Sequence, residues 1–82
     1  MVMAGIAEVK TAAEGLVVSN PNILSGTPVF RGTRLPVKTL FEYLADGLTL
    51  DYFLETFAGI TREDAQSVLQ YGWKRIASEL SE

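Results

Sequence analysis

Residues 36–65 read PVKTLFEYLADGLTLDYFLETFAGITREDA, and this stretch decides the fold of the second half of the chain. Apolar residues recur in it every three or four positions, which is the spacing of an amphipathic helix. Gly47 and Gly59 interrupt the pattern, and each is followed by a threonine, Thr49 or Thr61, that can cap the next helix. The stretch therefore predicts three helices joined by two short corners. We place them at about residues 37–46, 50–58 and 62–80.

The connection between the first and second predicted helices has the residue pattern of a helix C-cap. Gly47 is expected to adopt a positive φ angle and to end its helix, with Leu48 folding back on Tyr43 as in a Schellman motif. The third helix carries a long apolar stripe, which we interpret as core or as a dimer interface at Trp73: Ala65, Val68, Leu69, Gly72, Trp73, Ile76 and Leu80. Three amphipathic helices with tight corners fit a helix-turn-helix or a plain three-helix bundle, and the pattern leaves the two open.

The first half of the chain predicts strand and turn. Residues 16–18 and 28–31 are short β-prone runs, and the proline- and glycine-rich segments around them are turn-forming. Such strands are too short to form a sheet that stands alone. We assign residues 1–14 to an N-terminal arm and residues 15–82 to a single helix-turn-helix-type domain.

The residue types exclude several chemistries. The chain has neither cysteine nor histidine, so it lacks the usual ligands of zinc, iron and copper and the commonest acid–base side chain. No phosphate-binding loop, nucleophile elbow or dinucleotide-binding glycine pattern is present. We therefore expect no enzymatic activity, no cofactor and no metal. The N-terminus does not resemble a secretory signal and no apolar run is long enough for a membrane helix, so a cytoplasmic location is expected.

Charge is unevenly distributed. Residues 15–41 hold Arg31, Arg34 and Lys38 and no acid, whereas residues 42–64 hold six acids against Arg62. Arg31, Arg34 and Lys38 are candidate phosphate contacts, and Arg62 and Gln66 of the third helix are candidate base readers. Glu63 and Asp64 in the same turn oppose docking of that helix in the major groove. Arg34 has a second interpretation, as the side chain that pins the turn at Gly32–Thr33 to the helical core.

The acidic stretch suggests a protein partner. Glu42, Asp46, Asp51 and Glu55 are candidate contacts to a positively charged protein surface, although most charge runs are simply solvated helix faces. With 48% hydrophobic residues in 82, the chain also carries more apolar surface than a small core can bury. A homodimer is therefore expected, with residues 16–31 helping to join the subunits; a well-packed monomer is the alternative.

A family resemblance adds to this interpretation. Residues 20–37 read NPNILSGTPVFRGTRLPV, and ADGLT at 45–49 and ITREDA at 60–65 follow. This sequence resembles the family called domain of unknown function 433, over roughly residues 16–72. The resemblance implies a mainly α fold: a three-helix, homeodomain-like helix-turn-helix core with a short N-terminal β-strand and turn segment.

The resemblance also implies a function. Members of that family are often taken to be antitoxins paired with a PIN-like ribonuclease toxin. We therefore expect an antitoxin-like subunit that binds such a toxin and can also bind operator DNA. The alternatives are a DNA-binding regulator without a toxin and a structural dimerisation module.

Overall fold

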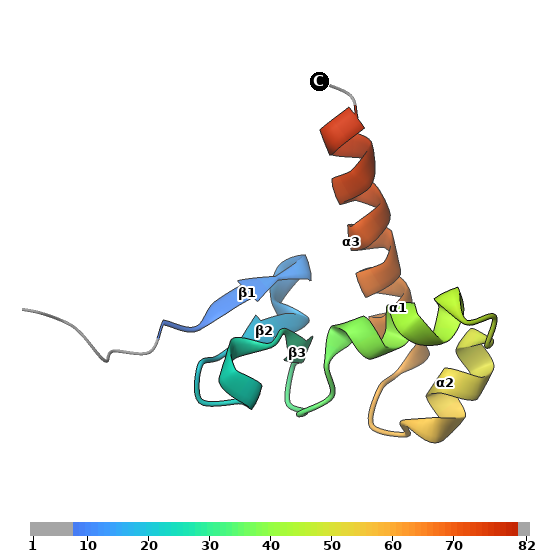
Figure 1. The fold of residues 1–82 in the computed structure, drawn as a ribbon, viewed down its shortest axis with the longest axis horizontal. Helices are drawn as coiled ribbons and strands as arrows, with labels where there is room; N and C mark the ends of the chain where they lie inside the picture. The colour runs from blue at the N-terminus through green and yellow to red at the C-terminus, as the bar shows by residue number, and fades with distance from the viewer. Residues whose placement is uncertain (1–7, 81–82) are drawn as a thin grey trace, which may run out of the picture. The chain divides into compact units, whose positions relative to one another are not determined.

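The computed structural model describes residues 8–80, which form three strands and three α-helices (Figure 1). The strands are β1 (Lys10–Ala12), β2 (Val17–Ser19) and β3 (Val29–Phe30). The helices are α1 (Val37–Ala45), α2 (Leu50–Thr56) and α3 (Arg62–Leu80). The chain divides into two compact units, one ending at Val37 and the other beginning at Lys38. We call them the sheet unit and the helical unit.

The fold class predicted from the sequence, a mainly α helix-turn-helix protein with a short strand and turn segment, is wrong. The three strands form one antiparallel sheet in the order β1-β2-β3, and this sheet belongs to a compact unit of its own. The architecture is therefore α+β. Residues 10–12, which we assigned to the N-terminal arm, form an edge strand of the sheet. The rest of the predicted arm before residue 8 lies outside the described residues.

The hairpin of β1 and β2 closes through an unusual turn. Lys10 pairs with Ser19 and Ala12 pairs with Val17. Between the strands, Ala13, Glu14 and Gly15 all have positive φ angles, of 53°, 57° and 89°. The Leu16 N–H donates to the Ala13 carbonyl at 3.1 Å, so Glu14 and Gly15 have the left-handed geometry of a type I′ turn. That turn matches the twist of paired strands, which is why it can close so short a hairpin.

The far edge of the sheet is covered by the chain that follows it. β3 pairs with β2, and its Val29 also bridges Pro36. The Phe30 N–H donates to the Leu35 carbonyl at 3.0 Å, and the Val37 N–H donates to the Pro28 carbonyl at 2.9 Å. Val29, Phe30, Val37 and Ala13 are the buried side chains of this unit. The turn after β3 therefore both protects the sheet edge and fixes the first residue of α1.

The first helix corner forms as predicted, whereas α2 ends at Thr56 and not at residue 58. Gly47 has φ +89°; its N–H donates to the Leu44 carbonyl, and the Leu48 N–H donates to the Tyr43 carbonyl, each at 3.0 Å. This pair of bonds is the Schellman motif, and the prediction for Gly47 is confirmed. The Thr49 hydroxyl accepts from the Tyr52 N–H at 3.0 Å, and the Thr61 hydroxyl accepts from the Asp64 N–H at 3.0 Å. Both predicted N-caps are therefore present.

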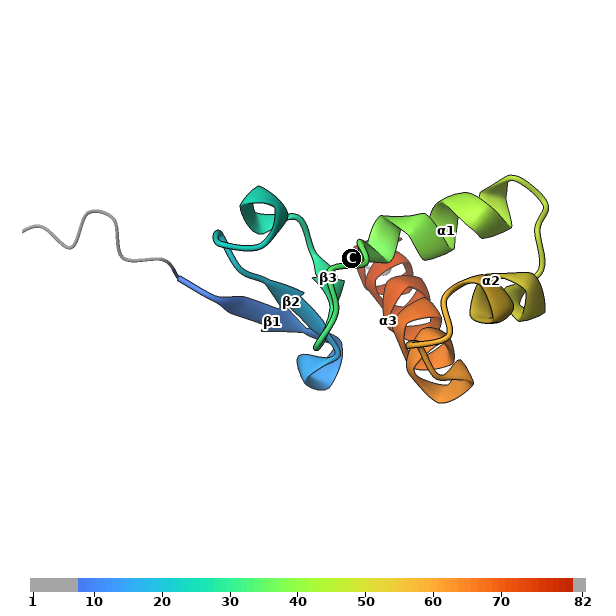
Figure 2. The same cartoon turned by 90° about the horizontal axis from the view of Figure 1, so that it is seen from below.

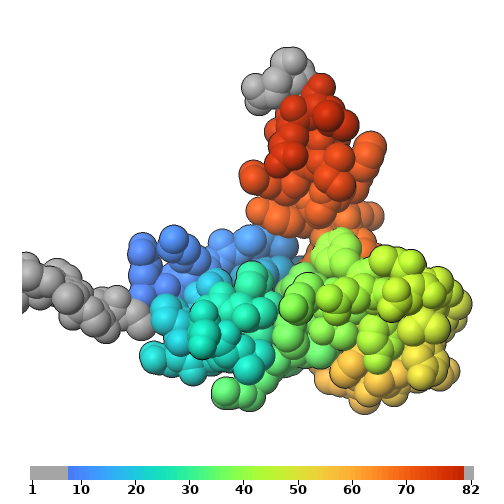
Figure 3. Space-filling view, viewed as in Figure 1, coloured from blue at the N-terminus to red at the C-terminus, as the bar shows by residue number. Residues whose placement is uncertain are grey.

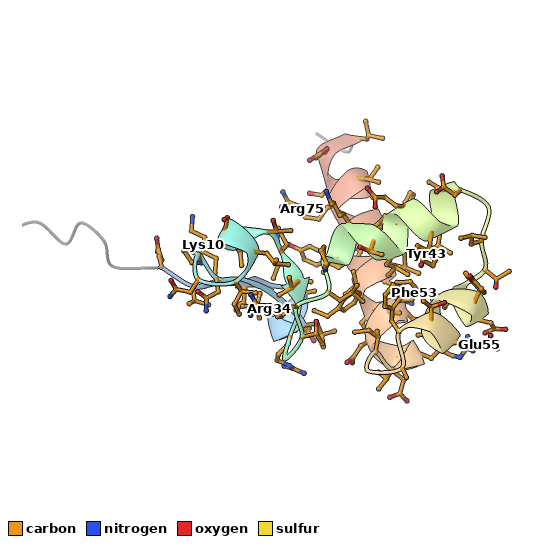
Figure 4. All side chains as sticks on the ribbon, turned by 60° about the horizontal axis from the view of Figure 1, so that its bottom comes forward. Lys10, Arg34, Tyr43, Phe53, Glu55 and Arg75 are labelled. Carbon is orange, nitrogen blue, oxygen red and sulfur yellow. The ribbon has the colours of Figure 1, made fainter. Side chains whose placement is uncertain are left out.

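The helical unit has a small apolar core with an aromatic cluster at one side. Its buried side chains are Leu40, Phe53, Ile60, Ala65 and Val68. The rings of Tyr43, Phe53 and Phe57 lie 5.0–5.6 Å apart, and Figure 4 shows Tyr43 and Phe53 turned toward each other between α1 and α2. Edge-to-face and tilted pairs of this kind add to the burial energy of the rings. They fix α2 against α1 after the chain reverses direction at the corner (Figure 2).

None of the helices within residues 8–80 combines the length and the apolar character needed to cross a membrane.

Candidate functional site

The cations of the sheet unit lie on its surface. Arg31 and Arg34 are both exposed. Arg31 lies against the hairpin turn, because a Cβ carbon on Gly15 would be 3.4 Å from Arg31 Nη1. The Arg31 N–H also donates to the Leu16 carbonyl at 2.8 Å. The backbone thus holds Arg31 in place while its guanidinium group remains accessible to an anion.

The structure corrects our second interpretation of Arg34. The turn after β3 is held by Thr33, whose hydroxyl donates to the Phe30 carbonyl at 2.8 Å and accepts from the Leu35 N–H at 3.0 Å. Arg34 has no hydrogen bond or ion pair with any residue between 8 and 80, and it is exposed. A threonine can hold this turn because its short hydroxyl reaches neighbouring backbone groups. Arg34 is therefore not the side chain that pins the turn.

Lys38 is a weaker candidate for a phosphate contact than its sequence neighbourhood indicated. It lies in the first turn of α1, and Glu42 and Asp46 follow at four-residue spacing on the same face. All three side chains belong to exposed residues. The helix therefore places a carboxylate one turn from Lys38, which lowers the local positive potential.

Arg62 and Asp51 neutralise each other. The Arg62 guanidinium donates to the Asp51 carboxylate, which joins the first turn of α3 to the first turn of α2. Their side chains are 52% and 70% exposed, so this surface pair contributes only about 0–1 kcal/mol. From the sequence, Arg62 is predicted to contact nucleic acid and Asp51 to contact a protein. The structure pairs them, and leaves Gln66 exposed one turn further along α3.

The predicted acids form two exposed pairs, one at the C-terminal end of α1 and one on α2. Glu42 and Asp46 lie one turn apart at the end of α1, and Asp51 and Glu55 lie one turn apart on α2. Residues 38–80 carry seven carboxylates against four cationic side chains, and six of those carboxylates precede residue 65. This part of the helical unit is therefore strongly acidic. We call Glu42, Asp46, Asp51 and Glu55 the acidic surface.

Of the two interpretations of the second half of the α3 stripe, core and dimer interface, its exposure excludes the core. Ala65 and Val68 are buried as expected, but Trp73 is 65%, Ile76 52% and Leu80 82% exposed. The reason is length, because α3 has 19 residues whereas α1 has 9 and α2 has 7. Figures 1 and 3 show α3 extending well past the two short helices. Trp73 is therefore not a core residue.

Among residues 8–80, no group of three or more carboxylates is placed to hold a metal ion.

The sheet hairpin and the acidic three-helix unit thus define a small α+β protein whose predicted site residues are all exposed. The chain belongs to the family described as protein of unknown function (DUF433), whose model matches residues 17–72. The match includes residues of both units and ends before Trp73.

One curated relative is an uncharacterised protein, y4eO, of Sinorhizobium fredii (strain NBRC 101917 / NGR234). It is 35% identical over 78 residues, which cover 87% of this chain and 35% of the relative. The chain thus spans about a third of that protein's length. No solved structure matches the chain.

Proposed function

We propose that this chain is a non-enzymatic, antitoxin-like subunit that forms a homodimer and binds a PIN-like ribonuclease. The observation that carries the proposal is the acidic surface, on which Glu42, Asp46 and Glu55 have no cationic partner within residues 8–80. A ribonuclease must present a positive surface to bind the phosphates of RNA. An acidic protein surface can bind there and exclude the substrate.

One structural and one compositional observation support this role. The Schellman corner at Gly47 and the cap at Thr49 fix α1 against α2, so the carboxylates of the two helices are displayed from a defined scaffold. The chain also contains no histidine or cysteine, which leaves it with few groups for acid–base or nucleophilic chemistry.

Calorimetric titration tests the proposal, with a purified PIN-like ribonuclease as the titrant. Glu42→Lys reverses a charge on the acidic surface, and Glu79→Lys makes the same change on α3. We expect Glu42→Lys to weaken binding about tenfold or more and Glu79→Lys to have little effect. Raising the salt concentration should weaken wild-type binding and reduce the difference between wild type and Glu42→Lys. Absence of binding, or equal binding by wild type and Glu42→Lys, would overturn the proposal.

A second function, binding of operator DNA, is favoured by the sheet unit. Its exposed cations Arg31 and Arg34 lie apart in sequence from the acidic helices, and neither has a carboxylate partner within residues 8–80. Each phosphate that the protein neutralises adds about 0.9 to the slope of log affinity against log salt. Arg31→Ala and Arg34→Ala should each flatten that slope in a fluorescence-anisotropy titration. If wild type shows no salt-dependent DNA binding at low ionic strength, this second function is excluded.

A further inference from the structure

The exposed half of α3 carries a regular apolar stripe. Leu69, Trp73, Ile76 and Leu80 are separated by four, three and four residues, which is the spacing of the seam positions in a coiled coil. Leu69 is half-buried at the edge of the core, and the other three side chains are more than half exposed. A seam of this kind normally lies against another helix, and α1 and α2 end too early to cover it.

The stripe continues into a neighbouring exposed ring. A Cβ carbon on Gly72 would lie 3.4 Å from Cζ of Phe41, so this ring covers the α3 backbone one turn before Ile76. Phe41 is itself 41% exposed. The apolar surface therefore extends from the tip of α3 onto α1, and we call Phe41, Trp73, Ile76 and Leu80 the α3 patch.

We propose that the α3 patch is the interface between two copies of this chain, paired through antiparallel α3 helices. In that arrangement Trp73 of one copy packs against Ile76 of the second copy, and Leu69 packs against Leu80. Each large ring thus meets an aliphatic side chain, whereas parallel helices would place the two indole rings against each other. The opposed helix dipoles also favour the antiparallel direction.

The side chains beside the seam are compatible with a second copy. Gly72 and Ala77 flank it and are small, so two backbones can approach closely. On a helical projection Lys74, Arg75 and Ser78 lie on the opposite side of α3 from the seam. Glu79 is the charged side chain of this half of α3 nearest the seam, and the antiparallel register sets it near Gly72 of the second copy, so no two like charges of the α3 helices are opposed, as a self-complementary two-fold contact requires.

The area of the patch sets the expected strength. Trp73, Ile76 and Leu80 expose on the order of 400 Å² of apolar surface per copy. A standard interface buries about 800 Å² per partner, so the stripe supplies about half of it, with Phe41 and the small flanking residues adding to the contact. We therefore expect a weak dimer with a dissociation constant in the micromolar range.

This inference rests on the homodimer of the proposed function and gives that dimer its interface. Of the two interfaces considered from the sequence, residues 16–31 and the stripe of the third helix around Trp73, it assigns the contact to α3. Two matched substitutions separate these possibilities. Ile76→Lys places a charge in the seam, and Ser78→Lys places the same charge on an exposed position of the opposite face.

Light scattering coupled to size-exclusion chromatography measures the mass, which should be about twice 9.0 kDa for wild type at high micromolar concentration. Ser78→Lys should give the same mass, and Ile76→Lys should give the monomer mass. Leu80→Lys should also be monomeric, and because its side chain is 82% exposed it keeps the test valid if Ile76→Lys loses helicity in far-UV circular dichroism. Trp73, the single tryptophan of the chain, should shift its emission to longer wavelength when wild type is diluted below the dissociation constant.

Two results would overturn the inference. One is a wild type that remains monomeric at high micromolar concentration. The other is a dimer that persists in both Ile76→Lys and Leu80→Lys, which would place the contact elsewhere, for example on residues 16–31. A monomer that still binds the ribonuclease refutes this inference and leaves ribonuclease binding intact. If wild type is a dimer that Ile76→Lys or Leu80→Lys dissociates, but it does not bind the ribonuclease, the α3 interface is supported and ribonuclease binding is refuted.

Discussion

The corner at Gly47 allows a prediction in which one variable, the backbone angle, can be isolated. Gly47 has φ +89°, and a Cβ carbon added there would meet no atom within 4 Å. Any cost of Gly47→Ala therefore comes from the left-handed conformation, which disfavours L-residues by about 1–2 kcal/mol. A smaller unfolded-state entropy in the variant offsets up to about 1 kcal/mol of that cost. We expect a net loss of about 1 kcal/mol for Gly47→Ala and a larger loss for the β-branched Gly47→Val.

Gly59 provides the matched control. A Cβ carbon on Gly59 also meets no atom within 4 Å, but its φ angle lies outside the left-handed range. Gly59→Ala should therefore be neutral or stabilising by up to about 1 kcal/mol. Urea unfolding followed by circular dichroism at 222 nm gives both free energies, and about 1 kcal/mol corresponds to a change of roughly 4–8 °C in Tm for a chain of this size. Equal stabilities of Gly47→Ala and Gly59→Ala would refute the argument from the backbone angle.

Three other substitutions test the local reasoning. Thr49→Ala removes the hydroxyl that accepts from the Tyr52 N–H, and urea unfolding should show a loss of about 1 kcal/mol. Glu14→Asn should raise Tm in a thermal melt, because asparagine tolerates the φ of 57° at the first central position of the hairpin turn better than glutamate does; a lower Tm would contradict the turn geometry. Arg62→Ala should lower stability by less than about 1 kcal/mol at low salt and by less still at high salt, because its pair with Asp51 is exposed. A loss that does not depend on salt would show that Arg62 acts through packing.

The helices and their corners could be predicted because their signals are local. Gly47, Thr49 and Thr61 determine their own surroundings through bonds to residues no more than four positions away. The sheet could not be predicted in the same way. Its first hairpin closes through Glu14-Gly15. The usual sequence signal of a type I′ hairpin turn is Asn-Gly or Asp-Gly, and neither is present here. Without that signal, residues 10–12 resemble a tail rather than a strand.

The candidate site was predictable in its residue types and not in its pairings. All nine predicted site residues are exposed, as charged and amide side chains usually are. The ion pair of Arg62 with Asp51 joins residues 11 positions apart, and it depends on how α2 turns back toward α3. The exposure of Trp73 depends on the lengths of other helices rather than on its own periodicity. The unequal lengths of the three predicted helices were the one sequence signal that could have revealed it.

Hydrogen–deuterium exchange of the chain, alone and with the PIN-like ribonuclease, tests the central claim most directly. Bound ribonuclease should slow amide exchange in residues 37–56, which include α1 and α2 and their acidic surface. Exchange in the second half of α3 should instead slow as the concentration of the chain alone is raised. Slowed exchange confined to residues 10–30 on addition of the ribonuclease, with residues 37–56 unchanged, would contradict the account.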